Sequence, residues 1–526
     1  MNHAAQKGET ATTVKPKEKD EVAVPIPPDG GYGWVIVIAS FICNMVVDGV
    51  SYCFGIFKDD LMEYYGESSG KVAWVGSILT GVTMCSGPLV SAFANRYGCR
   101  LCCIAGALIS AAAFGLSVLC PSVEMLMIVY GVVGGIGFGL MYLPAVVCVG
   151  YYFESRRSLA TGIAVCGSGF GTVVFAPLGT YLLHYGWKSA HLWLAGVCLA
   201  CVVFGALMKP IEYAGEEKTL KSYKVQGSHI TLHSNGEVAK AHTSLVDIAT
   251  SRVSISSTRS KTSNVLPPLA RKDVFYGGSV TNLKEFQSQK SLHNYRQSVL
   301  SIPQLNSKKS QLLDMDLLKD PVFLAIALVN LFSFIGLYIP FVYIGDRAKE
   351  DGFDDDAASF LISIMGITNT VGRIVCGFIA DFPKVNTMWV HNICLVVMTA
   401  SVAAIPICHS YAAYISVATV YGTSMAGFIS LCSILLVDYL GLDKLTSAFG
   451  FTLLFRGTGA FIGSPLAGML FDATKSYTVS FLAGSAFFGI ASVITFLVPV
   501  LHRRKAKTVT DEEAMTPMNA KKEEEE

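Results

Sequence analysis

The chain has 526 residues, of which 52% are hydrophobic and only 15% are charged. Soluble proteins carry about 25% charged residues, so this balance excludes a typical soluble enzyme and indicates a protein that crosses a membrane many times. The formal net charge of +1 provides no basic surplus for binding nucleic acid, so we expect no nucleic acid partner.

The N-terminal segment is hydrophilic and reads MNHAAQKGETATTVKPKEKDE. It lacks the apolar core of a cleavable signal peptide. We therefore expect residues 1–33 to form an N-terminal tail, and we expect the first span itself to direct insertion into the membrane.

Apolar runs of about 20 residues, the length that crosses a bilayer as a helix, recur along the whole chain. The twelve runs lie near 34–57, 73–94, 99–119, 124–148, 158–183, 189–208, 321–344, 358–381, 387–407, 412–437, 446–472 and 477–501. This pattern predicts an all-α membrane protein with twelve transmembrane helices in a lipid bilayer.

Two features of the first half could suggest a bound metal or nucleotide. Cys99, Cys102 and Cys103 form a cluster, CRLCC, but no second cluster follows at ligand spacing, so we expect no metal site. The glycines spaced by four from Gly131 to Gly139 favour close helix packing, and no Gly-Lys-Ser/Thr motif accompanies them. No nucleophile–base pair stands out either, so we expect neither an enzyme nor a cofactor.

A long polar segment, 209–319, separates the sixth run from the seventh. It is rich in Ser, Thr, Lys and Arg, as in SRVSISSTRSKTSN. Such a composition cannot bury enough apolar surface to fold alone, so we predict a disordered linker.

Basic residues indicate the orientation of the bundle. An even number of spans places both termini and the linker on one side, and Lys15, Lys17, Arg503 and Arg504 make that side basic. The positive-inside rule therefore predicts that both termini and the linker are cytoplasmic, including the tail 502–526. Short loops agree less well, because basic residues such as Lys58 fall on the opposite side.

The two halves of the chain repeat each other. Residues 162–178, GIAVCGSGFGTVVFAPL, match residues 450–466, GFTLLFRGTGAFIGSPL, at three glycines and at the final Pro-Leu. We therefore predict two six-helix bundles, 34–208 and 320–501. Two six-helix halves in parallel repeat are the architecture of major facilitator transporters, which bind substrate between the halves near the middle of the bilayer.

The loops after the second and eighth runs also resemble the signature of that superfamily, Gly-x-x-x-Asp-Arg-x-Gly-Arg/Lys. The first copy has Asn95 in place of Asp and keeps Arg96 and Arg100, and the second copy keeps Asp381 and Lys384. The resemblance implies that these residues form a gate between the halves on the cytoplasmic side.

Few ionisable residues lie inside the apolar runs, and Asp48, Arg373 and Arg456 are among them. A charge at the centre of a transmembrane helix costs about 2.5–3.5 kcal/mol on insertion scales, so such residues are candidates for function. The alternative for each is a buried ion pair or a side chain that reaches the membrane surface. An arginine can bind a carboxylate through two parallel hydrogen bonds. Asn369 lies one turn before Arg373, where it could bind a keto or hydroxyl group of the substrate.

Two motifs resemble the monocarboxylate transporter family. PPDGGYGWVIV (27–37) is similar to the family signature Asp-Gly-Gly-Trp-Gly-Trp, with Asp29, Gly30 and Trp34 at matching positions. YYFESRRSLATGIAVCGSGFG (151–171), with Arg156 and Arg157, resembles the second family signature. The resemblance implies transport of small monocarboxylates such as lactate, pyruvate and ketone bodies at the plasma membrane. It also implies protons and a single-span accessory glycoprotein as candidate partners.

The resemblance extends to the buried charges. Arg373 matches an arginine that family members carry in the eighth helix, whereas Asn369 and Tyr52 replace the Asp and Lys that accompany it in proton-coupled members. We therefore expect Arg373, Asn369, Tyr52 and Arg456 to bind substrate, and Asp48 to be the candidate proton-coupling group. The sequence leaves two alternatives open. One is a uniporter of other small organic solutes, such as amino acids, creatine-like or carnitine-like zwitterions, and the other is a non-transporting membrane sensor or scaffold.

Overall fold

The computed structural model describes residues 28–154, 156–209, 272–280, 283–289, 295, 299, 315–380 and 385–523, with the side chains of 378, 380 and the residues after 505 left out. One compact unit comprises Pro27–Ile211 and Leu266–Glu526, and all the described residues belong to this unit. The other, Met1–Ile26 with Glu212–Val265, lies outside the described residues.

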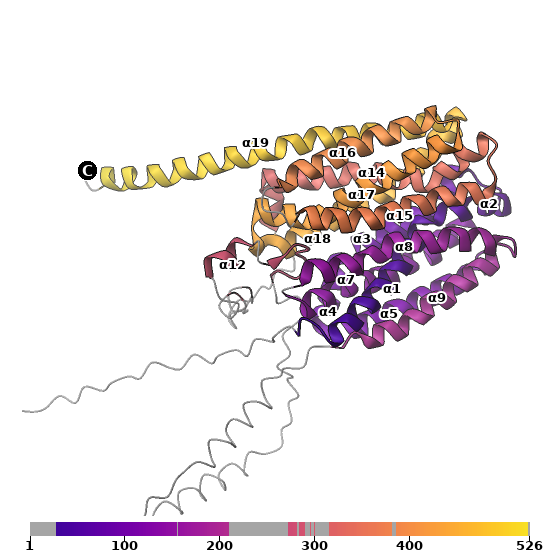
Figure 1. Cartoon of the computed structure of the whole chain (residues 1–526), viewed down its shortest axis with the longest axis horizontal. Helices are drawn as coiled ribbons and strands as arrows, with labels where there is room; N and C mark the ends of the chain where they lie inside the picture. The colour runs from indigo at the N-terminus through magenta and orange to yellow at the C-terminus, as the bar shows by residue number, and fades with distance from the viewer. Residues whose placement is uncertain are drawn as a thin grey trace, which may run out of the picture. The chain divides into compact units, whose positions relative to one another are not determined.

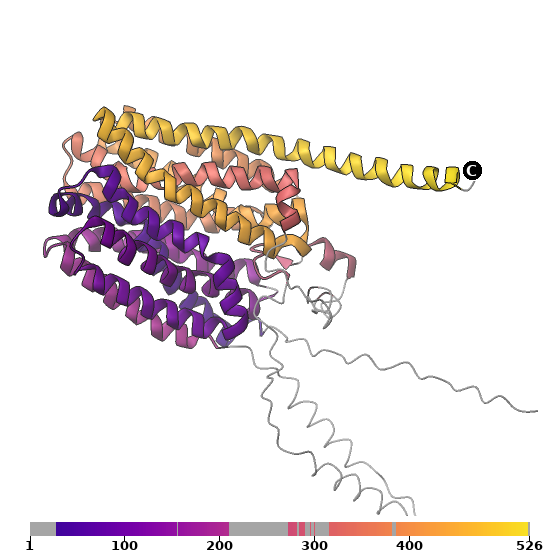
Figure 2. The same ribbon diagram turned by 180° about the vertical axis from the view of Figure 1, so that it is seen from behind.

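The fold is a bundle of helices (Figures 1 and 2). The N-terminal half contains α1 (Tyr32–Tyr52), α2 (Phe54–Tyr65), α3 (Ser69–Cys85), α4 (Gly87–Tyr97), α5 (Cys99–Ser117), α6 (Val123–Leu126), η1 (Met127–Val133), α7 (Gly134–Tyr152), α8 (Arg157–Leu183) and α9 (Trp187–Leu207). The rest contains α12 (Lys284–Gln289), η3 (Met315–Lys319), α14 (Pro321–Glu350), α15 (Asp355–Ala380), α16 (Thr387–Ala404), η4 (Ile405–Ile407), α17 (Tyr411–Leu440), η5 (Leu442–Lys444), α18 (Leu445–Thr474) and α19 (Tyr477–Glu523).

The predicted all-α membrane fold is confirmed. Within the described residues, 11 helical stretches are long and apolar enough to cross a membrane, and α3 with α4 makes a twelfth that bends by 50°. The first predicted span also breaks, because α1 ends at Tyr52 and α2 continues from Phe54. The last helix, α19, runs to Glu523, far beyond the predicted end at 501. Ala, Lys, Glu and Met in this extension are strong helix formers.

The halves meet chiefly where α3 packs on α18 and α8 packs on α15. Glycines make both contacts possible. A Cβ atom on Gly169 of α8 would lie 2.7 Å from the Gly366 carbonyl oxygen, and one on Gly457 of α18 would lie 2.8 Å from the Gly81 carbonyl oxygen. Gly169 and Gly457 are equivalent positions of the predicted repeat, so the two halves use the same close approach twice.

One stretch of the predicted linker lies against the bundle. Val274, Phe275 and Tyr276 are buried, and the Phe275 ring stacks on Phe449 of α18 with 4.6 Å between the centroids. This stretch differs from the prediction of a linker that is disordered throughout 209–319, because three apolar side chains pack together between the halves. Residues 210–271 lie outside the described part of the chain.

Candidate functional site

The candidate site consists of charged and aromatic side chains inside the bundle. Asp48 of α1, Arg373 of α15 and Arg456 of α18 are only 7%, 5% and 5% exposed. The Tyr142 side chain of α7 interacts electrostatically with all three, so both halves contribute to one charged cluster. This is the location that the sequence predicts for substrate binding, between the two halves.

Arg373 is held by its own helix and by the opposite half. Nε donates to Asn369 Oδ1 at 2.8 Å, and Nη1 donates to the Val165 carbonyl oxygen of α8 at 3.3 Å. The Asn369 amide donates in turn to the Gly422 carbonyl oxygen at 3.4 Å. Asn369 therefore orients the guanidinium group, and both ends of its amide are already engaged.

Arg456 is arranged in a similar way. Nε donates to Asn330 Oδ1 of α14 at 2.8 Å, and the guanidinium carbon lies 5.1 Å from the centroid of the Phe334 ring. Nη2 is buried, and no atom of the described residues accepts a hydrogen bond from it. The contact with Phe334 is a cation–π interaction, which leaves the hydrogen-bonding capacity of the terminal nitrogens unused.

Asp48 interacts electrostatically with Arg373. Among the described residues, no ion pair within 4.0 Å joins Asp48 to Arg373 or to Arg456. In this conformation neither guanidinium group therefore has a carboxylate within 4.0 Å among the described residues, and the proton-coupling role of Asp48 stays a prediction.

Tyr52 lies on the same side of α1 as Asp48 and crosses to the other half. Its ring stacks on Tyr338 and Phe341 of α14, with centroid distances of 5.5 and 4.6 Å. The ring thus forms an aromatic wall beside the charged cluster. Its role in substrate binding stays a prediction.

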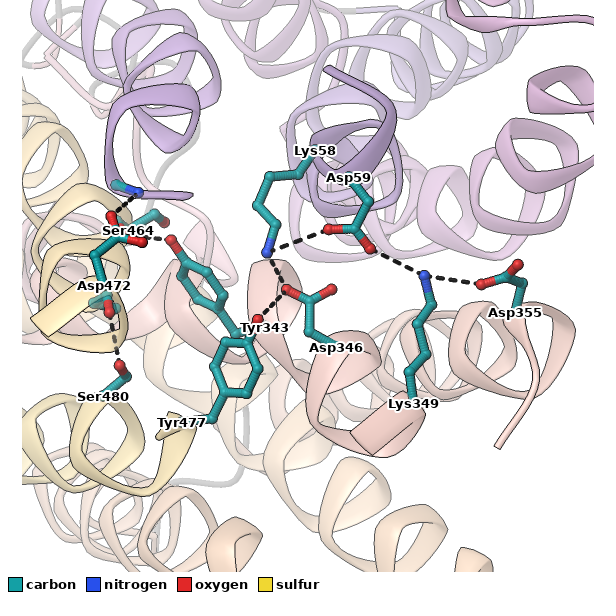
Figure 3. Close-up of polar contacts among 12 residues, drawn as sticks. Lys58, Asp59, Tyr343, Asp346, Lys349, Asp355, Ser464, Asp472, Tyr477 and Ser480 are labelled. Carbon is teal, nitrogen blue, oxygen red and sulfur yellow. Dashed lines mark hydrogen bonds and ion pairs between the residues drawn. The ribbon is translucent and has the colours of Figure 1, made fainter. Parts of the chain in front are cut away.

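A second polar network lies at the end of the bundle where α2 meets α14 (Figure 3). Lys58 is 1% exposed, forms an ion pair with Asp346, and lies 4.5 Å from the centroid of the Tyr343 ring. The Tyr477 hydroxyl donates to the same Asp346 carboxylate at 3.1 Å. Nearby, Lys349 pairs with Asp59 at 3.1 Å and thereby links the two halves a second time.

Sequence reasoning placed Lys58 in an outer loop and missed this network. The signal was available, because Phe54, Phe57, Lys58 and Leu61 follow the 3.6-residue period of one helix face and are all buried. A lysine on such an apolar face needs a counter-charge, and Asp346 provides it from 288 residues away.

A cavity of about 300 Å³ opens beside this network. Asp59, Asp60, Glu63, Asp346 and Asp355 line it, against a single lysine, Lys349. Burial, with the charges of Asp59 and Glu63, raises the pKa of Asp60 above its usual range. The mouth of the bundle is therefore strongly acidic at this end.

The two family-like motifs contact each other at the opposite end. The Asp29 carboxylate accepts from the Glu154 backbone N–H at 2.6 Å, and the Asp29 N–H donates to the Tyr152 carbonyl oxygen at 3.1 Å. Trp34 packs edge-on against Phe153, with 5.0 Å between the ring centroids. Gly30 lies next to Asp29, just before the first turn of α1.

Arg156 and Arg157 mark the start of α8, as expected, but they differ in environment. Arg156 is exposed, whereas Arg157 is completely buried. The Arg157 guanidinium pairs with Asp273 Oδ2 at 2.7 Å and donates to the carbonyl oxygens of Gly150 and Phe153. Asp273 belongs to the stretch 272–280 of the linker, so Arg157 is a structural anchor for that stretch.

The predicted gate is described only in its first copy. Arg96 lies at the end of α4 with its guanidinium carbon 5.4 Å from the Tyr97 ring, and Arg100 is exposed. Asn95 is half-buried beside them. Asp381 and Lys384 lie outside the described residues, so the gate between the halves stays a prediction.

Comparisons with known proteins agree with this architecture. A model of the Major Facilitator Superfamily matches residues 40–457 and 326–523. Monocarboxylate transporter 7 of Homo sapiens is 30% identical over 475 residues, which cover 90% of this chain and 87% of that protein. Monocarboxylate transporter 14 of Homo sapiens is 28% identical over 505 residues, covering 92% and 94%. Monocarboxylate transporter 9 of Gallus gallus is 28% identical over 465 residues, covering 86% and 90%.

A solved structure is similar in fold. The partially occluded inward-open conformation of the xylose transporter XylE from E. coli superposes with a TM-score of 0.57 and covers 89% of this chain and 99% of that one. The sequence identity is 12%, so this likeness supports the major facilitator fold and nothing about the solute.

Proposed function

Because the chain belongs to the monocarboxylate transporter family of the Major Facilitator Superfamily, we propose that it carries small monocarboxylates across the plasma membrane by alternating access. Proteins of this fold are transporters that bind a small molecule between their halves, and they are not enzymes. Lactate, pyruvate and ketone bodies are the substrates proposed for this chain.

The observation that carries this proposal is the state of Arg373. Its guanidinium group is buried between the halves, oriented through Nε by Asn369, and has no carboxylate within 4.0 Å among the described residues. A buried cation without a counter-charge is unfavourable, so a site of this kind favours an anionic ligand. A carboxylate can accept from the terminal nitrogens while Asn369 keeps the group in place.

The orientation proposed is that both termini and the 209–319 linker are cytoplasmic. The end of the bundle that carries Asp29 and Arg157 then faces the cytoplasm, where Arg96 and Arg100 belong to the proposed gate. The acidic cavity beside Lys58 then faces outward. A single-span accessory glycoprotein is a further proposed partner, by analogy with family members.

Proton coupling through Asp48 is proposed as the mode of transport. The carboxylate lies within electrostatic range of Arg373 and could pair with it when the solute is absent. The second candidate is a uniporter of zwitterions, which is favoured by the presence of one carboxylate beside two arginines in the cluster around Tyr142.

Uptake of radiolabelled acids into cells that express the chain tests the proposal. The wild type should take up lactate or pyruvate, and Arg373→Lys should lower kcat/KM by about 100-fold, because a lysine keeps the charge but loses the two-pronged donor. Surface abundance should stay unchanged. Near-normal uptake by Arg373→Ala would remove the assigned role, and no uptake of any acid by the wild type would favour the uniporter or the scaffold.

A further inference from the structure

Arg456 has more hydrogen-bonding capacity than its surroundings use. Its Nε donates to Asn330, its face lies over Phe334, and its buried Nη2 has no acceptor among the described residues. A buried donor without a partner is unfavourable, and more so when it is charged. Such a group calls for an explanation, and an acceptor outside the described residues is one.

The neighbouring protein groups are already occupied. Asn330 Oδ1 accepts from Arg456, and its Nδ2 donates to the Ile326 carbonyl oxygen at 2.8 Å. In the described part of the chain no carboxylate lies within 4.0 Å of Arg456. Asn330 is therefore a positioning residue, and Arg456 Nη2 has no acceptor among the described residues.

Arg373 shows the same arrangement on α15. In both residues Nε is held at 2.8 Å by the side-chain oxygen of an asparagine. Both interact electrostatically with Tyr142, so both belong to one site. With Asp48 ionised the three charges sum to +1, which a single carboxylate neutralises, and one guanidinium group then remains to bind another part of the same molecule.

Asn369 is less available than Arg456 as that second contact in this conformation. Its amide already accepts from Arg373 Nε and donates to the Gly422 carbonyl oxygen, which leaves one N–H for the predicted contact with a keto or hydroxyl group. Arg456 offers the same chemistry, a hydrogen-bond donor, from a buried nitrogen that has no acceptor among the described residues.

We propose that Arg456 determines specificity by donating to a second acceptor oxygen of the substrate while Arg373 holds the carboxylate. The inference rests on the proposed function. The site then selects acids that carry an oxo, hydroxyl or second carboxylate group near the first carboxylate. It rejects the plain acid of equal length, because that acid leaves Arg456 buried without an acceptor.

Three-carbon acids provide a direct test. Uptake of propionate, lactate, pyruvate and malonate is measured for the wild type and for Arg456→Gln. The wild type should favour the best of the three functionalised acids over propionate by about tenfold or more in kcat/KM. Arg456→Gln should bring this ratio close to one, with propionate uptake retained. The ranking of pyruvate, lactate and malonate shows whether the second oxygen is oxo, hydroxyl or carboxylate.

The matched control is Thr458→Ala, because Thr458 lies on the same helix with an exposed side chain bonded to its own turn. It should keep the wild-type ratio. Where Arg456→Gln fails to reach the surface, Arg456→Met, which has no donor, provides the ratio instead. An unchanged ratio in the surface-expressed variant, or a wild type without preference, overturns the inference and leaves the carboxylate carrier standing. Absence of uptake of all four acids overturns the proposed function itself.

Discussion

Buried charges at the residue scale fall into two groups. Arg157 and Lys58 each have a carboxylate at ion-pair distance, Asp273 and Asp346 respectively. Arg373 and Arg456 have none within 4.0 Å among the described residues, although they are almost as deeply buried. A buried charge without a counter-charge is strongly unfavourable. The protein itself neutralises Arg157 and Lys58, whereas Arg373 and Arg456 are suited to bind an anionic ligand.

Asp48 gives a prediction at this scale. Asp48→Asn keeps the size of the side chain and removes its titratable proton, so uptake should no longer be accelerated by an inward proton gradient. The measurement is initial uptake as external pH is lowered at fixed internal pH, in wild type and variant. Ser51→Ala, one turn away on α1, is the control. A gradient effect of equal size in the Asn variant would show that Asp48 is not the coupling group.

Glycines control the packing of elements. On α8, a Cβ atom at Gly169 would meet the Gly366 backbone at 2.7 Å, whereas one at Gly162 would have no neighbour within 4 Å. The two positions lie on one helix and carry the same residue, yet only Gly169 faces the other half. Close approach to the other half is therefore a property of the stripe of α8 that contains Gly169, whereas Gly167 and Gly171 approach the backbone of α1.

This difference gives a prediction for paired variants. Gly169→Ala should lower stability by about 1–3 kcal/mol through overpacking, whereas Gly162→Ala should be neutral or slightly stabilising, because alanine favours a helix. Thermal unfolding of the purified proteins in detergent compares the two directly. Equal melting temperatures would show that the close contact between α8 and α15 does not contribute to the stability of the protein.

The limits of sequence reasoning are also clearest for elements. Long apolar runs predicted the spans because each must satisfy its own backbone hydrogen bonds in lipid. The 50° bend between α3 and α4 coincides with Gly87-Pro88, a helix-breaking pair that is visible in the sequence. The break at Cys53 has no proline or glycine at the broken position, so local propensity gave no warning there. The buried arginines could be identified because a charge inside a transmembrane helix is energetically unfavourable. The Lys58–Asp346 pair joins residues 288 positions apart, and no local pattern contains that partnership.

The whole molecule is bridged at both ends. At one end Lys58–Asp346 and Lys349–Asp59 join α2 to α14 (Figure 3), and at the other Arg157 and Phe449 both contact the stretch 272–280. A carrier that works by alternating access must break one set of contacts while it keeps the other. The strength of each set therefore sets the balance between the two conformations.

The pair Lys58–Asp346 gives a prediction about this balance. Lys58→Met leaves Asp346 without its buried partner, which should destabilise the closed form of that end by about 3–5 kcal/mol. A cysteine introduced at Ser359, which lines the acidic cavity, should then react faster with a membrane-impermeant maleimide. Lys349→Met is the control, because its partly exposed pairs should contribute only about 0–1 kcal/mol. Equal labelling rates for the two variants would refute this role.

Topology is tested on intact cells. A protease site placed within 209–271 should be cut only after permeabilisation, because the basic termini and the even number of spans make that side cytoplasmic. A protease site at the C-terminal tail should behave in the same way. Cleavage in intact cells would contradict the proposed orientation and place both termini and the linker outside.

The stretch 272–280 has a consequence for kinetics. It is covalently attached to α14 through the rest of the linker, and its anchor on the other half is Arg157. After release from Arg157 it stays tethered nearby, so it returns at a high effective concentration rather than by diffusion from solution. The lifetime of the state that is closed at this end then depends on how fast the stretch 272–280 dissociates from Arg157. Shortening or stiffening the linker would change the rate of the transport cycle without changing the residues that bind the solute.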